Sequence, residues 1–119
     1  MKVEYASDKL KKKCSDLKSA QKLFSGDKSL ARSLLARINA LESAETLKDI
    51  IVQRPFHFHK LANNMEGYFA IDVKSRRDPW RIILEPLDAA GERYVPCHID
   101  EIVEQVRIVE IAEVSKHYE

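Results

Sequence analysis

The stretch VRIVEIAEV at residues 106–114 is almost continuously apolar, which is typical of a strand covered on both sides and suits a central place in a sheet. Shorter strand-like stretches precede it at residues 56–61, 68–73 and 81–87. Turn-forming residues separate these stretches at 63–67 and 88–91. We therefore predict an antiparallel meander that ends in residues 106–114.

The first part of the chain predicts helices. Residues 3–5 alternate like a short strand, and helical periodicity follows at residues 8–24 and 28–44, with a break at Ser25-Gly26-Asp27 between them. The apolar stripes are Leu10, Cys14, Leu17 and Phe24 in the first helix and Leu30, Leu34, Leu35, Ile38 and Leu41 in the second. Neither helix can bury its stripe alone, so both must pack on a sheet. We predict an α+β fold in one domain over residues 1–119: an N-terminal strand and helical hairpin on a mainly antiparallel sheet of roughly four to five strands.

The composition, 45% hydrophobic and 33% charged with a net charge of +1, is that of an ordinary globular protein. Residues 1–55 carry 12 Lys/Arg and 7 Asp/Glu, whereas residues 56–119 carry 8 and 12, so positive charge is concentrated locally. No apolar stretch approaches the roughly 20 residues that span a bilayer, and the first residues lack the apolar core of a signal peptide. We therefore expect a cytoplasmic protein. Cys14 and Cys97 form no C-x-x-C pair and are expected to be free thiols.

Imidazoles and an arginine fall on one predicted sheet face. In Phe56-His57-Phe58-His59 the side chains alternate, so the phenylalanines turn towards the helices, and His57 and His59 share the other side. By the same parity Arg81 joins them, and the terminal His117-Tyr118 could reach the rim of this surface. Cleavage of RNA by its own 2′-hydroxyl needs a base, an acid and positive charge near the phosphorus, which such side chains supply without a cofactor. We therefore predict a metal-independent site for RNA cleavage.

Two other interpretations of these residues stay open. The face could be a polar surface that only contacts water. Alternatively, His57 and His59 could bind a metal ion, with Cys97-His98-x-Asp100 supplying further ligands. The run Lys11-Lys12-Lys13 is interpreted as a solvated helix face that could add nonspecific phosphate contacts.

Four short motifs follow one another along the chain. They are His59-Lys60-Leu61, Glu66-Gly67-Tyr68, Trp80-Arg81-Ile82 and Glu113-Val114-Ser115-Lys116-His117-Tyr118. In order and spacing they resemble the HigB branch of the RelE-like toxins of bacterial type II toxin–antitoxin systems. Members of that family are typically ribosome-dependent mRNA endonucleases that inhibit translation. A cognate antitoxin, often with a helix-turn-helix domain, silences them, so the resemblance implies the ribosome, mRNA and such an antitoxin as partners.

Carried onto this chain, the resemblance implies roles for individual residues. The implied catalytic set is His59 as proton carrier, Arg81 as phosphate stabiliser, and His117 and Tyr118. The implied RNA-binding set is Lys60, Arg76, Arg77 and Lys116. Many relatives carry Lys-Gly after the histidine motif, whereas Ala62-Asn63 follow Leu61 here. That departure supports the alternative of a catalytically weak or inactive toxin-like binding module that mainly holds an antitoxin or another protein.

Overall fold

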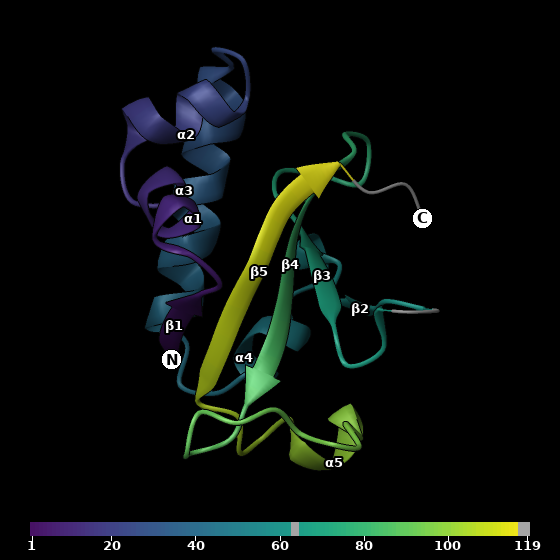
Figure 1. The fold of residues 1–119 in the computed structure, drawn as a ribbon. Coiled ribbons are helices and arrows are strands. Elements are labelled where there is room, and N and C mark those ends of the chain that lie inside the picture. Colours follow the sequence, from purple (N-terminus) through teal and green to yellow (C-terminus); the bar gives the residue numbers. More distant parts are fainter. Residues whose placement is uncertain (63–64, 117–119) are drawn as a thin grey trace.

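The computed structural model describes residues 1–62 and 65–116, whose arrangement Figure 1 shows. The elements in chain order are β1 (Lys2–Tyr5), α1 (Asp8–Lys13), α2 (Leu17–Leu23), α3 (Lys28–Ser43), α4 (Lys48–Ile51), the 3-10 helix η1 (Arg54–Phe56), β2 (His59–Lys60), β3 (Phe69–Asp72), β4 (Trp80–Leu87), α5 (Ile99–Ile102) and β5 (Ile108–Lys116). The helices come mostly before the meander, which makes the fold α+β, as predicted.

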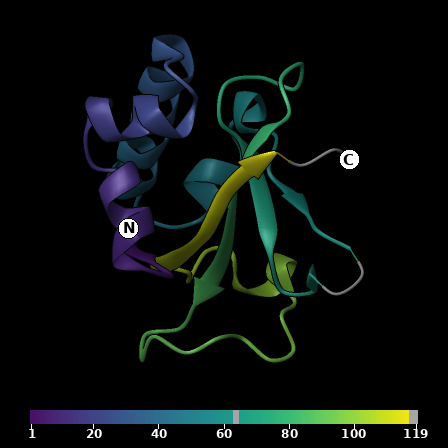
Figure 2. The same ribbon diagram turned by 45° about the horizontal axis from the view of Figure 1, so that its top comes forward.

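The five described strands form one mixed sheet in the order β1-β5-β4-β3-β2. Strands β2 to β5 pair antiparallel, which confirms the predicted meander, whereas β1 lies parallel to β5 at one edge. Strand β5 lies between β1 and β4, but only one of its faces is fully covered: Val109, Ile111 and Val114 are buried in the core, whereas residues of the other face are partly or fully exposed. In Figures 1 and 2 the helices α1–α3 lie beside the β1 edge, and β2 lies at the far edge.

Helix α3 supplies much of the layer that covers the sheet. Its buried residues are Ala31, Leu34, Ile38 and Leu41, and they share one core cluster with Ile71, Ile82 and Val109 of the sheet. The carboxylate of Asp27 accepts a hydrogen bond from the Leu30 N–H at 3.0 Å and so caps the start of the helix. Ala31 rather than Leu30 lies deepest in the first turns. No helix in the ranges 1–62 and 65–116 is long and apolar enough to cross a membrane.

The predicted first helix over residues 8–24 is wrong as a single helix. Two short helices, α1 and α2, replace it, with Cys14 buried at the end of α1. The break follows from Asp16, whose carboxylate accepts a hydrogen bond from the Ser19 N–H at 2.8 Å and caps α2. A residue that caps a new helix has extended backbone, and φ and ψ of Asp16 are −145° and 157°. The chain therefore turns where the apolar spacing alone suggests continuity.

The predicted strand over residues 56–61 is also mostly wrong. Helices α4 and η1 fill most of residues 48–56, and the strand β2 begins only at His59. Pro55 lies in the first turn of η1, and His57 then takes a left-handed backbone with φ 50° and ψ 50°, which interrupts any strand. Phe56 is buried beneath the Arg37 guanidinium, 4.2 Å from the ring centroid, while Phe58 stacks on Phe69. These contacts, rather than strand alternation, set the positions of the two phenylalanines.

Candidate functional site

The sheet register decides which polar side chains share a face. His59 pairs with Ala70, two residues before Asp72, and Asp72 pairs with Arg81, which in turn pairs with Ser115. Because paired residues and alternate residues along a strand point the same way, His59, Asp72 and Arg81 lie on one face. That face is opposite to the one that packs on α3, whose sheet contacts come from residues of the other parity such as Ile71 and Ile82.

Asp72 joins the two ends of this cluster. Its side chain is 1% exposed, and its Oδ1 lies 3.2 Å from Nε of Arg81 and 3.2 Å from Nδ1 of His57. Its Oδ2 is buried and has no hydrogen-bond partner among the described residues. A buried carboxylate needs partners that offset its desolvation, and here a guanidinium and an imidazole provide them. Asp72 therefore fixes the position of the His57 ring relative to Arg81.

The two histidines contact each other directly. Nδ1 of His59 donates to the backbone carbonyl of His57 at 2.8 Å, and the rings stack with their centroids 4.5 Å apart and an interplanar angle of 29°. A carbonyl only accepts, so Nδ1 of His59 must carry the hydrogen and Nε2 is its basic nitrogen. Nδ1 of His57 likewise faces an acceptor, the Asp72 carboxylate, and so carries its hydrogen. Two imidazoles thus stand side by side with defined tautomers.

The Arg81 side chain is buried and binds the backbone of the loop of residues 73–79. It is 8% exposed, and Nη1 donates to the carbonyls of Asp78 at 2.7 Å and Trp80 at 2.8 Å, and to that of Ser75 at 3.3 Å. Nη2 donates to the carbonyl of Arg76 at 3.4 Å. The guanidinium therefore holds this loop in place. Direct contact of Arg81 with a phosphate stays a prediction.

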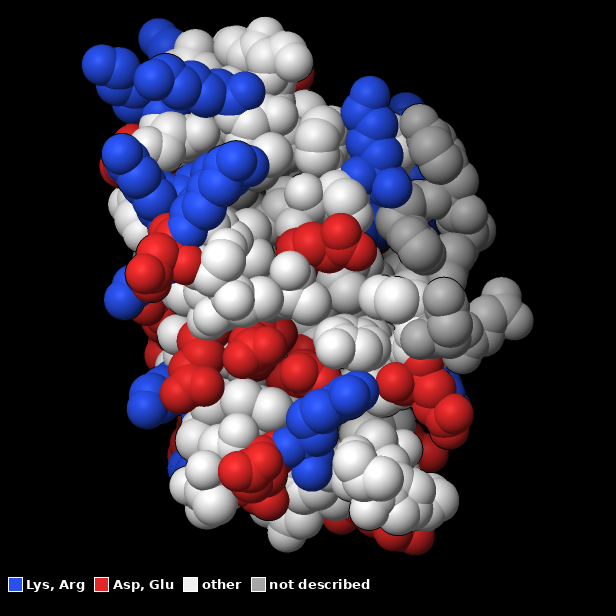
Figure 3. All heavy atoms as spheres, viewed as in Figure 1, with Lys and Arg blue, Asp and Glu red and all other residues white. Residues whose placement is uncertain are grey.

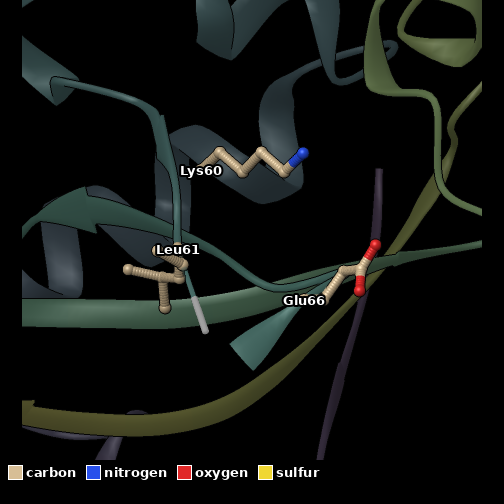
Figure 4. A pocket seen from close by; sticks show the side chains of 4 residues that line it. Lys60, Leu61 and Glu66 are labelled. Atoms are coloured by element: carbon tan, nitrogen blue, oxygen red, sulfur yellow. The ribbon is translucent and has the colours of Figure 1, made fainter. Parts of the chain in front are cut away.

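The residues predicted to bind RNA lie in three places. Arg76 and Arg77 are exposed on the loop that Arg81 holds, and Lys116 ends β5 with its Nζ 5.7 Å from the Trp80 ring centroid. Lys60 follows His59 directly and points to the other side of β2. It lines a pocket of about 340 Å³ with Leu61, Ala62 and Glu66, and Figure 4 shows its side chain extending away from Leu61. Lys60 is thus separated from the imidazole pair.

The last described residue, Lys116, lies close to Arg81. Lys116 pairs with Trp80, next to the pair of Arg81 with Ser115. His117 and Tyr118, the predicted terminal catalytic residues, lie outside the described residues.

In ranges 1–62 and 65–116, no three His, Cys, Asp or Glu side chains are grouped closely enough to hold a metal ion.

Neither cysteine is activated for nucleophilic chemistry. Burial raises the pKa of the Cys14 thiol to about 11. Burial also raises the pKa of Cys97, against the opposing charges of Lys60 and Arg93. Both thiols therefore stay protonated near neutral pH and are poor nucleophiles.

Sequence reasoning missed the part that His57 plays beside Asp72. The alternation in residues 56–59 placed His57 beside His59 on the predicted face, but the predicted catalytic set included His59 and not His57, and His57 had a named role only in the alternative of a metal site. The signal was Asp72 itself, because a carboxylate inside the apolar strand Phe69–Asp72 has to find a buried partner.

Comparisons with known proteins concern the fold of this chain. No family model matches it, and no curated protein matches it significantly. The fold resembles that of YafQ. The crystal structure of YafQ from E.coli strain BL21(DE3) matches with a TM-score of 0.49 and 13% sequence identity over 96% of this chain and 90% of that chain. Likeness in fold does not fix chemistry.

Proposed function

We propose that this protein is an endoribonuclease toxin that cleaves ribosome-bound mRNA in the cytoplasm without a metal ion and is silenced by a helix-turn-helix antitoxin. The observation that supports cleavage most strongly is the stacked pair of His57 and His59, each with a hydrogen bond at Nδ1 and a basic Nε2. The toxin type, the ribosome and the antitoxin come from the motif resemblance to RelE-like proteins. His59 belongs both to the imidazole pair and to those motifs.

The reaction is an intramolecular transesterification, in which the neighbouring 2′-hydroxyl displaces the 5′-oxygen from phosphorus. One imidazole Nε2 takes the proton of the 2′-hydroxyl, whose oxygen attacks phosphorus as the bond to the 5′-oxygen breaks. The other imidazole, in its protonated form, gives its proton to the departing 5′-oxygen. The products are a 2′,3′-cyclic phosphate and a 5′-hydroxyl, so no water, metal ion or cofactor is consumed. In this proposal His57 joins His59 as a proton carrier, and His117 and Tyr118 stay candidates because they follow β5 directly.

Positive charge for the phosphate comes from the loop beside the imidazoles. Arg76 and Arg77 are exposed there, and their guanidinium forks suit phosphate oxygens. Arg81 contributes through the loop carbonyls that it binds and through Asp72. Lys116 lies at the same end of the sheet, whereas Lys60 would contact RNA away from the cleaved bond. In this arrangement the proton carriers lie at the start of β2, and the groups that bind phosphate lie on the loop of residues 73–79.

A second candidate is a binding module that has lost catalysis. The observation that favours it is the burial of Arg81, whose guanidinium is occupied by the loop instead of facing a substrate. The Ala62-Asn63 sequence, where many relatives carry Lys-Gly, points the same way. Such a module would bind an antitoxin or another protein and leave mRNA intact.

The test is mRNA cleavage in a translating extract, read by primer extension, with wild type and three histidine variants. His59→Gln and His57→Asn should each lower cleavage by about 100-fold or more, which is the scale of one lost proton carrier. Asparagine is chosen at position 57 because it tolerates the left-handed backbone found there. His98→Asn, at the exposed histidine just before α5, is the matched control and should cut like wild type.

Two outcomes would reject the proposal. Equal cleavage by wild type and by folded His59→Gln would remove the imidazole pair from the chemistry. An intact mRNA with folded wild-type protein, together with normal growth on expression without a partner, would support the binding module instead.

A further inference from the structure

A groove lined by lysines lies at the other flank of the sheet, between α1, α2 and β5. One part is a hollow of about 510 Å³ lined by Lys9, Lys12, Lys13, Ser19, Lys22 and Leu23. A second hollow of about 210 Å³ shares Lys9, Lys13 and Leu23 and extends past Leu10 to Ala112, Glu113 and Val114 of β5. We call these adjoining hollows the lysine groove. Figure 3 shows the gathering of basic side chains over α1 and α2.

The positive charge of the lysine groove is not balanced locally. None of Lys9, Lys12, Lys13 and Lys22 forms an ion pair with a carboxylate within the described part of the chain. The nearby Asp16 carboxylate caps α2 and accepts from the N–H and hydroxyl of Ser19, and these hydrogen bonds, with a smaller contribution from the charge of Lys12, lower its pKa. Glu113 is the acidic residue among those lining the groove. Folding therefore leaves most of this charge available for a partner.

The helix ends account for some of these lysines, because Lys12, Lys13 and Lys22 lie in the last turns of α1 and α2, where the helix dipole favours positive charge. Lys9 and Lys13 stand four residues apart in α1, as do Lys18 and Lys22 in α2, so each pair places like charges on one helix face. Such pairs oppose helix formation slightly, and a bound anionic partner removes the repulsion.

The floor of the groove is apolar. Leu10 and Leu23 are partly buried and pack against the main core, and Val114 is buried below them. The described lining residues include no aromatic ring on which a base could stack and no arginine that could form a fork with phosphate. A nucleic-acid backbone would use the lysines but leave the leucines without an apolar contact. A polypeptide with both acidic and apolar side chains would use both.

We propose that the lysine groove binds an amphipathic acidic segment of a partner protein, with apolar side chains on Leu10 and Leu23 and carboxylates on the lysine rim. This proposal does not depend on RNA cleavage, because the groove lies beside the β1 edge and the imidazole pair lies beside the β2 edge (Figure 1). A partner seated here would leave the proposed site uncovered.

Fluorescence anisotropy with a labelled helical peptide of about 16 residues, Leu at spacings of three and four and Glu on both flanks, tests the proposal on the full chain. The peptide should bind at least about 10-fold tighter than a scrambled peptide of the same composition, because only the ordered one presents both faces together. The double variant Lys12→Glu/Lys22→Glu should lose about 10-fold in affinity, because it reverses two charges of the rim. The matched control Lys11→Glu/Lys28→Glu changes the same charge outside the groove and should stay within about 2-fold.

Leu23→Ala, checked for folding by circular dichroism, separates the peptide from RNA as the occupant. It should weaken the peptide several-fold and leave binding of a uridine oligonucleotide unchanged. Tighter binding of the oligonucleotide than of the peptide, through Lys12 and Lys22, would overturn the proposal in favour of a nucleic-acid surface. Equal binding of ordered and scrambled peptides, or an equal loss in the control double variant, would also overturn it.

Discussion

The two edges of the sheet differ in whether their charged side chains have partners of opposite charge. At the β2 edge each charged group of the inner cluster has a partner: Asp72 contacts Arg81 and His57, and Arg81 holds the loop carbonyls. At the β1 edge the lysine groove gathers like charges without carboxylate partners among the described residues. Matched charges in a buried cluster hold atoms in fixed positions, as proton transfer needs. Unmatched charges on an open groove supply attraction for something that arrives from solution.

Removing the centre of the matched cluster should have the largest effect on stability. Asp72→Ala leaves the Arg81 guanidinium buried without its carboxylate, and we expect a loss of about 3 kcal/mol in the free energy of unfolding, measured with urea. Asp100→Ala, at an exposed carboxylate in α5, should stay within about 0.5 kcal/mol. A loss that small for Asp72→Ala would show that the Asp72 carboxylate does not offset the burial of the Arg81 guanidinium.

A double-mutant cycle sharpens this expectation. In an Arg81→Met background the guanidinium is gone, so Asp72→Ala should cost clearly less than it does in the wild type. Equal costs in both backgrounds, measured by urea unfolding, would mean that Asp72 acts through contacts other than Arg81.

Glu85 lies on the same face of the sheet as Arg81, but its ion pair with Arg93 does not fully offset the burial of its carboxylate. Its carboxylate pairs with Arg93 at 2.8 Å, yet burial raises its pKa above the ordinary value of 4.5, with Arg93 opposing. A carboxyl whose pKa is higher in the folded state contributes stability below its unfolded pKa and loses it as the pH rises through the folded value. The free energy of unfolding of Glu85→Gln, compared with that of wild type, should therefore increase as the pH is raised from about 4.5 to 7, measured with urea. A constant difference across that range would contradict the assignment.

The smallest effect concerns the unmatched edge. Lys9→Glu replaces the repulsion between Lys9 and Lys13 with an attraction across one helical turn, so we expect a gain of about 0.3–0.5 kcal/mol at low salt. High salt should abolish that gain in thermal unfolding, because Lys9 is exposed to solvent. A gain that persists at high salt would point to packing instead of charge.

The sequence predicted the parts of this molecule whose neighbours along the chain decide their structure. The apolar stripe of α3 and the strands β3 to β5 follow from periodicity, and strand parity alone places His59 and Arg81 on one face. The helix over residues 8–24 and the strand over 56–61 were wrong because local capping at Asp16 and the left-handed His57 override the apolar spacing. The contact of Asp72 with His57 depends on the left-handed backbone that precedes β2, which no local pattern predicts.

The most direct test of metal-free cleavage by the imidazole pair is the chemistry of the new RNA ends. Fragments produced by wild-type protein in a translating extract can be probed for a 2′,3′-cyclic phosphate upstream and a 5′-hydroxyl downstream. We predict those two ends, because the 2′-oxygen is the attacking group. A 3′-hydroxyl with a 5′-phosphate would contradict the imidazole mechanism, since those ends arise when activated water attacks, as in metal-assisted hydrolysis.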